Sequence, residues 1–245
     1  MSVGGVEVYH KVYKPLLFEI FQAESPYCYR CPMGKEKNCC NIECLGSVRD
    51  ILERHSAEIA GIIVEPLVQA AGGMIVYPAE YLAGIRKLCD EYGVLLIDDE
   101  VAMGFGRTGK MFAFEHAGIV PDLVCLAKGL TAGYLPLSVT MATDEIYQAF
   151  YDDYERLKTF FHGHSFTGNP LAASVAVENL RILEEERIIE SIQPKIKVLQ
   201  ENLERFRKLD CVGDIRGIGM IGAVEIVKNK TTKEPYRFEE RIGAK

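Results

Sequence analysis

Carboxylates and a lysine follow two apolar runs near the middle of the chain. The first run, Val94–Ile97, ends in three carboxylates, Asp98–Glu100, and the second run, Leu123–Leu126, is followed by Lys128. Unbroken runs of Val, Ile and Leu are typical of buried parallel strands, and α/β sheets carry their chemistry at the carboxyl ends of such strands. The spacing therefore predicts a carboxylate and a lysine that face one crevice.

A carboxylate opposite a lysine suits a cofactor that needs an anion at one atom and an amine at another. A lysine just after a buried strand is expected to be desolvated, which favours its neutral, nucleophilic form. Pyridoxal phosphate chemistry uses a lysine for covalent attachment and an aspartate for the protonated ring nitrogen, and the lysine can then move a proton at the substrate. Taken alone, Lys128 could be a surface lysine and Asp99 a loop cap. Their joint position after consecutive strands favours the cofactor.

The elements that position these residues alternate between helix and strand. We expect strands at 60–64, 94–97, 122–126 and 137–143, and helices at 47–59 and 79–92, with Ser47 as an N-cap and Pro78 opening the second helix. Such alternation predicts βαβ units and a mostly parallel sheet. After Gly168 we expect helices at 171–185 and 194–209 and one strand at 214–227, with a domain boundary near residue 180.

Eight cysteines need a separate interpretation. Five lie between Cys28 and Cys44, and the C-x-x-C pair Cys28 and Cys31 could indicate zinc. The spacing does not repeat and no His lies within the cluster, so free thiols in a surface loop are the preferred interpretation and no metal ligand is assigned. The remaining three lie in apolar contexts and are expected to be small core residues: Cys89, Cys125 and Cys211.

Composition is that of an ordinary soluble globular protein, with 48% hydrophobic and 26% charged residues. The net charge of −7 argues against a nucleic-acid partner. No apolar run approaches the roughly 20 residues that cross a bilayer, and the N-terminus lacks the apolar region of a signal peptide. We therefore expect no membrane association and a cytoplasmic location.

Several motifs resemble class III (fold type I) aminotransferases. They are Ile97–Val101, Gly104–Gly109, Ala127–Gly129, Glu65–Pro66 with Gln69 and Gly72–Gly73, and His162–Pro170. The resemblance covers nearly the whole chain and is specific. It implies an α/β fold: part of a pyridoxal-phosphate-binding large domain over 1–180, with a mostly parallel sheet and flanking helices, and part of an α+β C-terminal small domain over 181–245.

The resemblance also implies roles for individual residues. Lys128 matches the lysine that binds pyridoxal 5'-phosphate. Asp99, which immediately precedes Glu100, matches the aspartate that pairs with the ring nitrogen, and Val101 matches a residue that packs on the ring. Glu65 is expected to shape the site or to cap the end of its strand.

A later segment is implied to serve the neighbouring subunit. His164 and Ser165 match positions that reach the cofactor phosphate of that subunit, and Gly163 matches a substrate-contacting glycine. The resemblance therefore implies a homodimer with a shared active site that binds a small-molecule amino donor and a keto acceptor.

Within the class, three stretches resemble the subfamily that aminates 8-amino-7-oxononanoate to 7,8-diaminononanoate in biotin biosynthesis. They are Ser25–Pro32, Glu65–Met74, and Ala149–Asp152 leading to Thr159–His164. The resemblance identifies the Cys-rich loop as a subfamily insertion, and it leaves the donor open between S-adenosylmethionine, lysine and others. The alternatives are another ω-amino acid transaminase, for ornithine, 4-aminobutyrate or a diamine, and a non-catalytic remnant that holds a metal through its Cys loop.

The sequence also departs from the family. The Ser-Gly-Ser-type phosphate loop and the aromatic of a Tyr-His-Gly segment are not in the sequence, and Met1–Gly5 resembles the stretch that follows that aromatic. The last residues, Arg241–Lys245, fall before the arginine expected for the substrate carboxylate, and Ala132 stands where a glycine is usual. We therefore expect a chain truncated at both ends that binds pyridoxal phosphate poorly and has little turnover.

Overall fold

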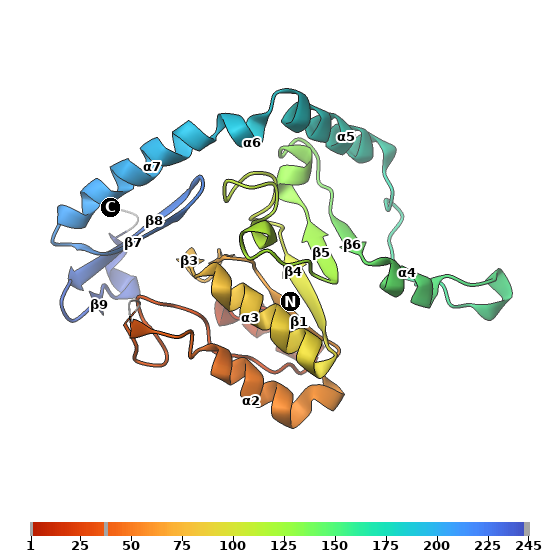
Figure 1. The fold of residues 1–245 in the computed structure, drawn as a ribbon, viewed down its shortest axis with the longest axis horizontal. Helices are drawn as coiled ribbons and strands as arrows, with labels where there is room; N and C mark the ends of the chain where they lie inside the picture. The colour runs from red at the N-terminus through yellow and green to blue at the C-terminus, as the bar shows by residue number, and fades with distance from the viewer. Residues whose placement is uncertain (1, 37–38, 243–245) are drawn as a thin grey trace.

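A four-stranded sheet lies at the centre of the computed structural model, which describes residues 2–36 and 39–242 (Figure 1). The strand order is β1-β4-β5-β6; the first three strands are parallel and β6 is an antiparallel edge strand. The mostly parallel sheet predicted from the sequence is therefore confirmed. The strands are β1 (Gly61–Val64), β4 (Leu95–Asp99), β5 (Leu123–Leu126) and β6 (Val139–Ala142).

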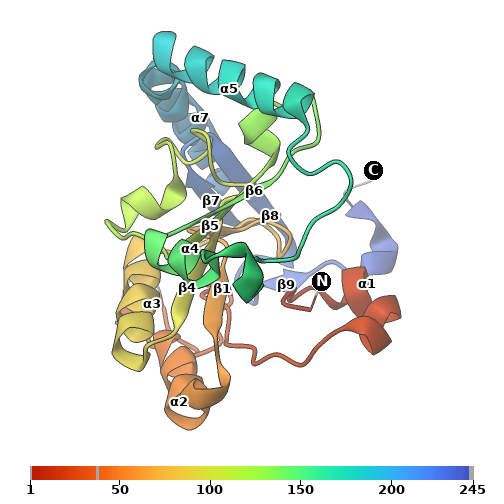
Figure 2. The same ribbon diagram turned by 90° about the vertical axis from the view of Figure 1, so that its right-hand side faces the viewer.

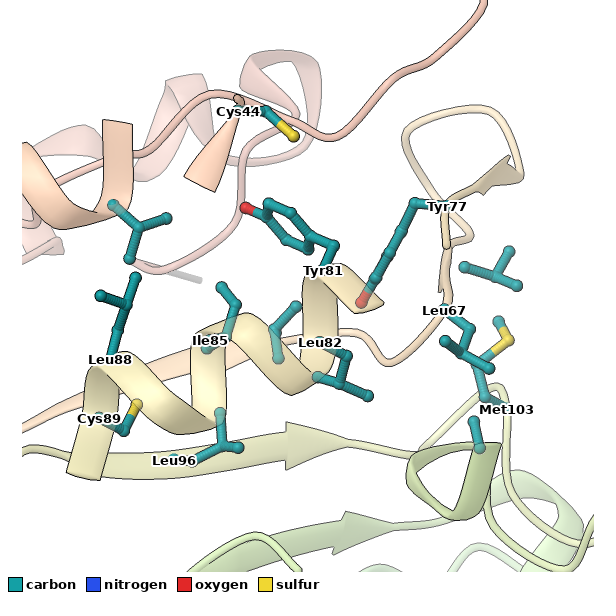
Figure 3. Close-up of a cluster of buried hydrophobic side chains, with 14 of the residues drawn as sticks. Cys44, Leu67, Tyr77, Tyr81, Leu82, Ile85, Leu88, Cys89, Leu96 and Met103 are labelled. Atoms are coloured by element: carbon teal, nitrogen blue, oxygen red, sulfur yellow. The ribbon is translucent and has the colours of Figure 1, made fainter. Parts of the chain in front are cut away.

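Helix α3 (Ala79–Tyr92) connects β1 to β4 and packs against the sheet, as Figure 3 shows. Pro78 is its N-cap, and Gly93 ends it in the left-handed region at φ 66°, where an L side chain would be strained. The predicted helix is confirmed, and its Leu82, Ile85, Leu88 and Cys89 are all buried in the main hydrophobic cluster. The burial of these apolar side chains is the main contribution that holds α3 against β4.

The segment before β1 is mostly irregular, as predicted. It contains two short helical pieces, α1 (Glu7–His10) and η1 (Lys11–Leu16), and then helix α2 (Leu45–His55), followed by η3 (Ser56–Glu58). The prediction that Ser47 caps α2 was wrong, because the helix begins two residues earlier, after Cys44. The Ser47 hydroxyl instead donates to Cys44 O at 3.0 Å and accepts from the Glu24 N–H at 3.1 Å, which ties the irregular segment to α2.

Short elements fill the connections between the main strands. Strands β2 (Val68–Gln69) and β3 (Ile75–Val76) form a small antiparallel pair after β1. Single 3-10 turns, η4 (Ala113–His116) and η5 (Lys128–Thr131), flank β5. Helix α4 (Asp144–Phe150) and turn η6 (Tyr154–Arg156) begin a segment that projects from the β6 edge of the sheet in Figure 1.

The last third of the chain forms an arc of helices and a second sheet (Figure 2). The helices are α5 (Pro170–Glu185), α6 (Ile188–Ser191) and α7 (Gln193–Arg205), with η7 (Phe206–Lys208). The antiparallel strands are β7 (Val212–Ile218), β8 (Ile221–Asn229) and β9 (Glu234–Pro235), followed by η8 (Phe238–Glu240). Helix α5 runs through residue 180 without a break, and the boundary near that residue stays a prediction.

The single strand predicted at 214–227 was wrong. The chain reverses at Gly219, which has a φ of 56°, and β7 then pairs antiparallel with β8, Arg216 opposite Ala223. Alternating apolar residues and glycines are compatible with one long strand or with a hairpin. The positive φ at Gly219 is what makes the turn possible.

Two of the predicted cysteine environments were also wrong. Cys44, expected in a surface loop, is buried because it lies directly before α2, and burial raises the pKa of its thiol to about 11. Cys211, expected in the core, is exposed just before β7. Within the described residues, no helix is both long and apolar enough to cross a membrane.

Candidate active site at the ends of β4 and β5

The sheet brings Asp99 and Lys128 to the same edge. Strands β4 and β5 are parallel neighbours, and Asp99 lies opposite Cys125 in their register. Lys128 follows Cys125 by three residues and begins η5 directly after β5. The prediction that a carboxylate and a lysine follow adjacent parallel strands is therefore confirmed. Their roles in chemistry stay predictions.

Lys128 has an unusual backbone and an exposed side chain. Its φ is 44°, in the left-handed region that non-glycine residues rarely adopt. Among residues 2–36 and 39–242, Nζ of Lys128 has no hydrogen-bond or ion-pair partner. The expected desolvation of this lysine was wrong for the chain as described, because its side chain is exposed.

Asp99 is half-buried and oriented by its own turn. Its Oδ1 accepts a hydrogen bond from the Val101 N–H at 3.1 Å, which fixes the carboxylate at the end of β4. Glu65, at the end of β1, also lies in this electrostatic environment. Burial raises the pKa of Glu65, and Asp99 raises it further, whereas the Ala70 N–H and Lys128 lower it. Glu65, Asp99 and Lys128 therefore form one group of interacting charges.

Glu65 has a local structural role as well. Its Oε2 accepts from the Ala70 N–H at 3.0 Å, and its backbone oxygen accepts from the Tyr77 hydroxyl. These bonds hold the turn between β1 and β2. Both sequence-based alternatives for Glu65, a strand-end cap and a residue of the site, agree with this position.

Asp98 and Glu100 lie on the opposite face of β4 from Asp99 because successive side chains of a strand alternate. Both are fully buried. Burial raises the pKa of Asp98 to about 8, and the neighbouring carboxylates Glu100 and Asp99 add to this. Burial likewise raises the pKa of Glu100 to about 7, although its Oε1 accepts from the Phe114 N–H. Of the three carboxylates, Asp99 alone is not fully buried, and its role in a site stays a prediction.

Gly163, His164 and Ser165 are not brought to this edge within one chain. They lie in the exposed segment between α4 and α5, which extends away from β4 in Figure 1. The hydrogen bonds that the structure describes for His164 are local. Its N–H donates to Thr167 Oγ1 at 3.0 Å, and its Nδ1 accepts from the Phe166 N–H at 3.1 Å. A neutral ring with Nδ1 as acceptor carries its proton on Nε2, which is then a donor.

A hollow of about 380 Å³ lies beside Lys128. Its walls come from the Gly-rich loop after β4, from the turn that begins at Lys128 and from α5, and include Phe105, Gly129 and Asn179. The sequence did not single out Phe105 or Asn179. An asparagine inside the apolar periodicity of a helix was the available signal for Asn179, because Asn is a poor helix former and usually has a specific partner.

The fold agrees with that of known proteins. Residues 1–242 match the family described as Aminotransferase class-III. The chain belongs to the class III aminotransferases. It is 52% identical over 246 residues to the adenosylmethionine-8-amino-7-oxononanoate aminotransferase of Geobacter sulfurreducens, a match that covers 100% of this chain and 54% of the relative. A relative with the same description from Methanocaldococcus jannaschii is 45% identical, over 99% of this chain and 55% of the relative.

Comparison with solved structures also identifies an aminotransferase fold. The crystal structure of the Methanocaldococcus jannaschii protein superposes with a TM-score of 0.91 at 44% identity and covers 100% of this chain and 54% of that one. An (S)-enantioselective omega-transaminase from Thermomicrobium roseum also gives a TM-score of 0.91, at 37% identity, over 100% of this chain and 54% of its own. The chain thus has an aminotransferase fold and spans about half the length of the curated relatives it matches.

Proposed function

We propose that this chain serves a pyridoxal-phosphate-dependent aminotransferase that transfers an amino group to 8-amino-7-oxononanoate in biotin biosynthesis. The observation that carries the proposal is the pairing of Asp99 and Lys128 at the ends of adjacent parallel strands. The substrate is proposed from the relatives, whose descriptions name an adenosylmethionine-8-amino-7-oxononanoate aminotransferase. S-adenosylmethionine is accordingly the first donor to test, with lysine as the second.

The residues of this edge fit pyridoxal 5'-phosphate. The cofactor supplies an aldehyde for an amine and a ring that takes up electrons when the substrate loses a proton. Lys128 offers an exposed amine without an ion-pair partner in the described chain. Asp99 offers a half-buried carboxylate that would keep a ring nitrogen protonated, and Val101 lies two residues farther along the same turn.

Each residue has a separate task in the proposed reaction. Lys128 would hold the cofactor, and its amine would be the group that carries a proton to and from the substrate carbon. Asp99 would stabilise the cationic ring nitrogen through its carboxylate. Asp98 and Glu100 lie on the far side of β4 and support the turn rather than the reaction.

We further propose a homodimer in which each subunit completes the other's site. The motif resemblance assigns Gly163–Ser165 to the neighbouring subunit's cofactor, and these residues lie exposed between α4 and α5. The Nδ1 atom of His164 accepts from the Phe166 N–H, which leaves Nε2 as the donor for a phosphate oxygen. The projecting segment exposes large apolar side chains that a partner subunit would cover: Tyr147, Phe150, Tyr151, Tyr154, Phe160, Phe161 and Phe166.

The shared site is tested by comparing pyridoxal 5'-phosphate with pyridoxal, which lacks the phosphate. We expect His164→Ala with Ser165→Ala to reduce borohydride-trapped pyridoxal 5'-phosphate on Lys128, with pyridoxal trapping unchanged. Sedimentation velocity should show a dimer. A monomer, or an equal loss for both compounds, would count against the shared site.

The substrate is tested by following an isotope-labelled amino group by mass spectrometry. Because this chain is expected to turn over little, we expect only slow movement of the label from S-adenosylmethionine or lysine to 8-amino-7-oxononanoate, and Lys128→Ala to abolish it. The second candidate is an ω-amino acid transaminase, which the 37% identity to the Thermomicrobium roseum enzyme favours. Label that enters ω-oxo acids but not 8-amino-7-oxononanoate would establish that alternative.

A further inference from the structure

The turn that begins at Lys128 is conformationally strained at both ends. Lys128 has a φ of 44°, and Ala132, directly after η5, has a φ of 50°. Neither residue is a glycine, so each left-handed conformation is unfavourable by itself. Such conformations persist only where surrounding groups hold them. The contacts around η5 therefore determine the backbone position from which the Lys128 side chain extends.

One side chain of α5 binds the backbone of this turn directly. Nδ2 of Asn179 donates to Gly129 O at 2.9 Å and to Leu130 O at 3.0 Å. These are the two carbonyl groups that follow Lys128. Because both hydrogens of one amide group are used, a change in the turn would break both bonds together.

The Gly-rich loop holds the same turn from another side. A Cβ atom added to Gly129 would lie 2.9 Å from Cδ2 of Phe105, so the ring packs directly on the backbone next to Lys128. Phe105 itself has a φ of 60°. The turn is thus fixed between an aromatic ring from the β4 loop and an amide group from α5.

We propose that Asn179 is a positioning residue that holds the strained turn at Lys128 and so directs its amine toward Asp99. Asn179 touches neither Asp99 nor the amine itself; it acts through the carbonyl groups of Gly129 and Leu130. The proposal rests on the proposed function, because it takes Lys128 to be the lysine that binds the cofactor.

Asn179→Asp and Asn179→Ser test this proposal. The aspartate keeps the shape but cannot donate when ionised, and the serine removes the amide without adding charge. The matched control is Asn202→Asp on α7, where Nδ2 of Asn202 also donates to a backbone carbonyl, Val198 O, at 2.7 Å. Thermal unfolding followed by circular dichroism identifies any variant that does not fold.

The first measurement is the site of covalent attachment. The chain is incubated with pyridoxal 5'-phosphate, reduced with borohydride and digested, and labelling of Lys128 is compared with that of the exposed lysines Lys87 and Lys195. We expect both Asn179 variants to lower the Lys128 preference by about tenfold, the effect of losing two hydrogen bonds. The Asn202→Asp variant should show the same preference for labelling Lys128 as the original chain.

The second measurement needs no cofactor. We expect the amide groups of Leu130 and Ala132, which donate to Ala127 O and Gly129 O, to exchange hydrogen faster in both Asn179 variants. Unchanged exchange together with an unchanged Lys128 preference in the folded variants would overturn the proposal. An equal effect of Asn202→Asp on amide exchange and on the Lys128 preference would also overturn the proposal. If the original chain itself shows no preference for Lys128, the proposed function fails, and amide exchange still tests the role of Asn179.

Discussion

The three carboxylates at the end of β4 have different properties because they alternate between two environments. Asp99 is half-buried and accepts from the Val101 N–H. Asp98 is fully buried on the other face, and neither of its oxygens has a hydrogen-bond partner in the described chain. A buried carboxyl group without donors stays protonated more readily than one in water.

Asp98 should therefore make the protein less stable as pH rises. Burial raises its folded-state pKa from 3.8 to about 8, so between about pH 4 and pH 8 the unfolded chain releases a proton that the folded chain retains. Stability is greatest below this window and falls through it, by up to about 1.4 kcal/mol for each unit of pKa difference. Glu100, whose pKa is raised to about 7, acts in the same direction.

Urea unfolding of Asp98→Asn between pH 4 and pH 8 measures this effect. We expect a shallower pH slope than in the original chain, with the remaining slope due to Glu100. Asp210→Asn, an exposed change, should leave the slope as it is. An unchanged slope in Asp98→Asn would contradict the assignment.

The sequence distinguished these carboxylates only in part. Alternation along a strand predicts that Asp99 differs from its neighbours, and motif resemblance selected Asp99. Burial of Asp98 without a partner was not predictable, because it depends on what α3 and the β2–β3 turn place over that face. The exposure of Lys128 was missed for a similar reason: the covering of a strand end is a tertiary property.

The Gly-rich loop after β4 receives the C-terminal elements. A Cβ atom on Gly106 would lie 2.8 Å from Ile189 Cδ1, and one on Gly109 would lie 3.1 Å from Ile196 Cδ1. The tip of the β7–β8 hairpin approaches even more closely, and the Met220 N–H donates to Arg107 O at 3.0 Å. This loop is thus a contact surface between the two halves of the chain.

Gly219→Ala should disrupt this contact. Gly219 has a φ of 56°, and an added Cβ would lie 2.2 Å from the backbone carbon of Thr108. Strain and overlap together are expected to cost about 2–4 kcal/mol in the free energy of unfolding. Gly118→Ala is the control, because Gly118 has a φ of 63° with no atom within 4 Å of an added Cβ.

Chemical denaturation separates the two contributions. The control should lose only about 1 kcal/mol, the cost of the left-handed conformation. Equal losses of unfolding free energy in Gly219→Ala and Gly118→Ala would show that the hairpin tip does not depend on close packing against the loop. The sequence suggested close packing from its glycines but missed the hairpin, because a period-2 pattern does not locate a reversal.

Arg216 connects distant parts of the whole molecule. Its guanidinium group donates to Gly73 O and Met74 O in the β2–β3 turn and pairs with Asp214 and Glu225 of the C-terminal sheet. Tyr27 of the N-terminal loop joins the network by donating its hydroxyl to Glu225 at 2.7 Å. Three segments far apart in the sequence therefore meet at one side chain.

Arg216→Leu should be strongly destabilising. Its side chain is 9% exposed, and its loss leaves two carbonyl groups and two carboxylates with fewer donors, at a cost of about 3 kcal/mol. Arg181 also pairs with two carboxylates, Glu178 and Glu185, but its side chain is 50% exposed. Arg181→Leu should therefore lower the free energy of unfolding much less than Arg216→Leu does. Similar losses of unfolding free energy in the two variants would refute this role of Arg216.

The overall fold followed from the sequence because helix and strand periodicities alternate regularly between residues 60 and 143. The contacts of Arg216 and Asn179 did not follow from the sequence, because each joins residues more than 40 positions apart. Such long-range contacts depend on how the completed elements pack. They are also the contacts that hold the proposed site in place.

The central claim is that Lys128 is the lysine that binds pyridoxal 5'-phosphate. Borohydride trapping followed by peptide mass spectrometry measures the label on every lysine of the chain. We expect Lys128 to carry most of the label even where binding is weak, and Lys128→Ala to leave only low, scattered labelling. Labelling spread evenly over the exposed lysines, or unchanged in total by Lys128→Ala, would contradict the account.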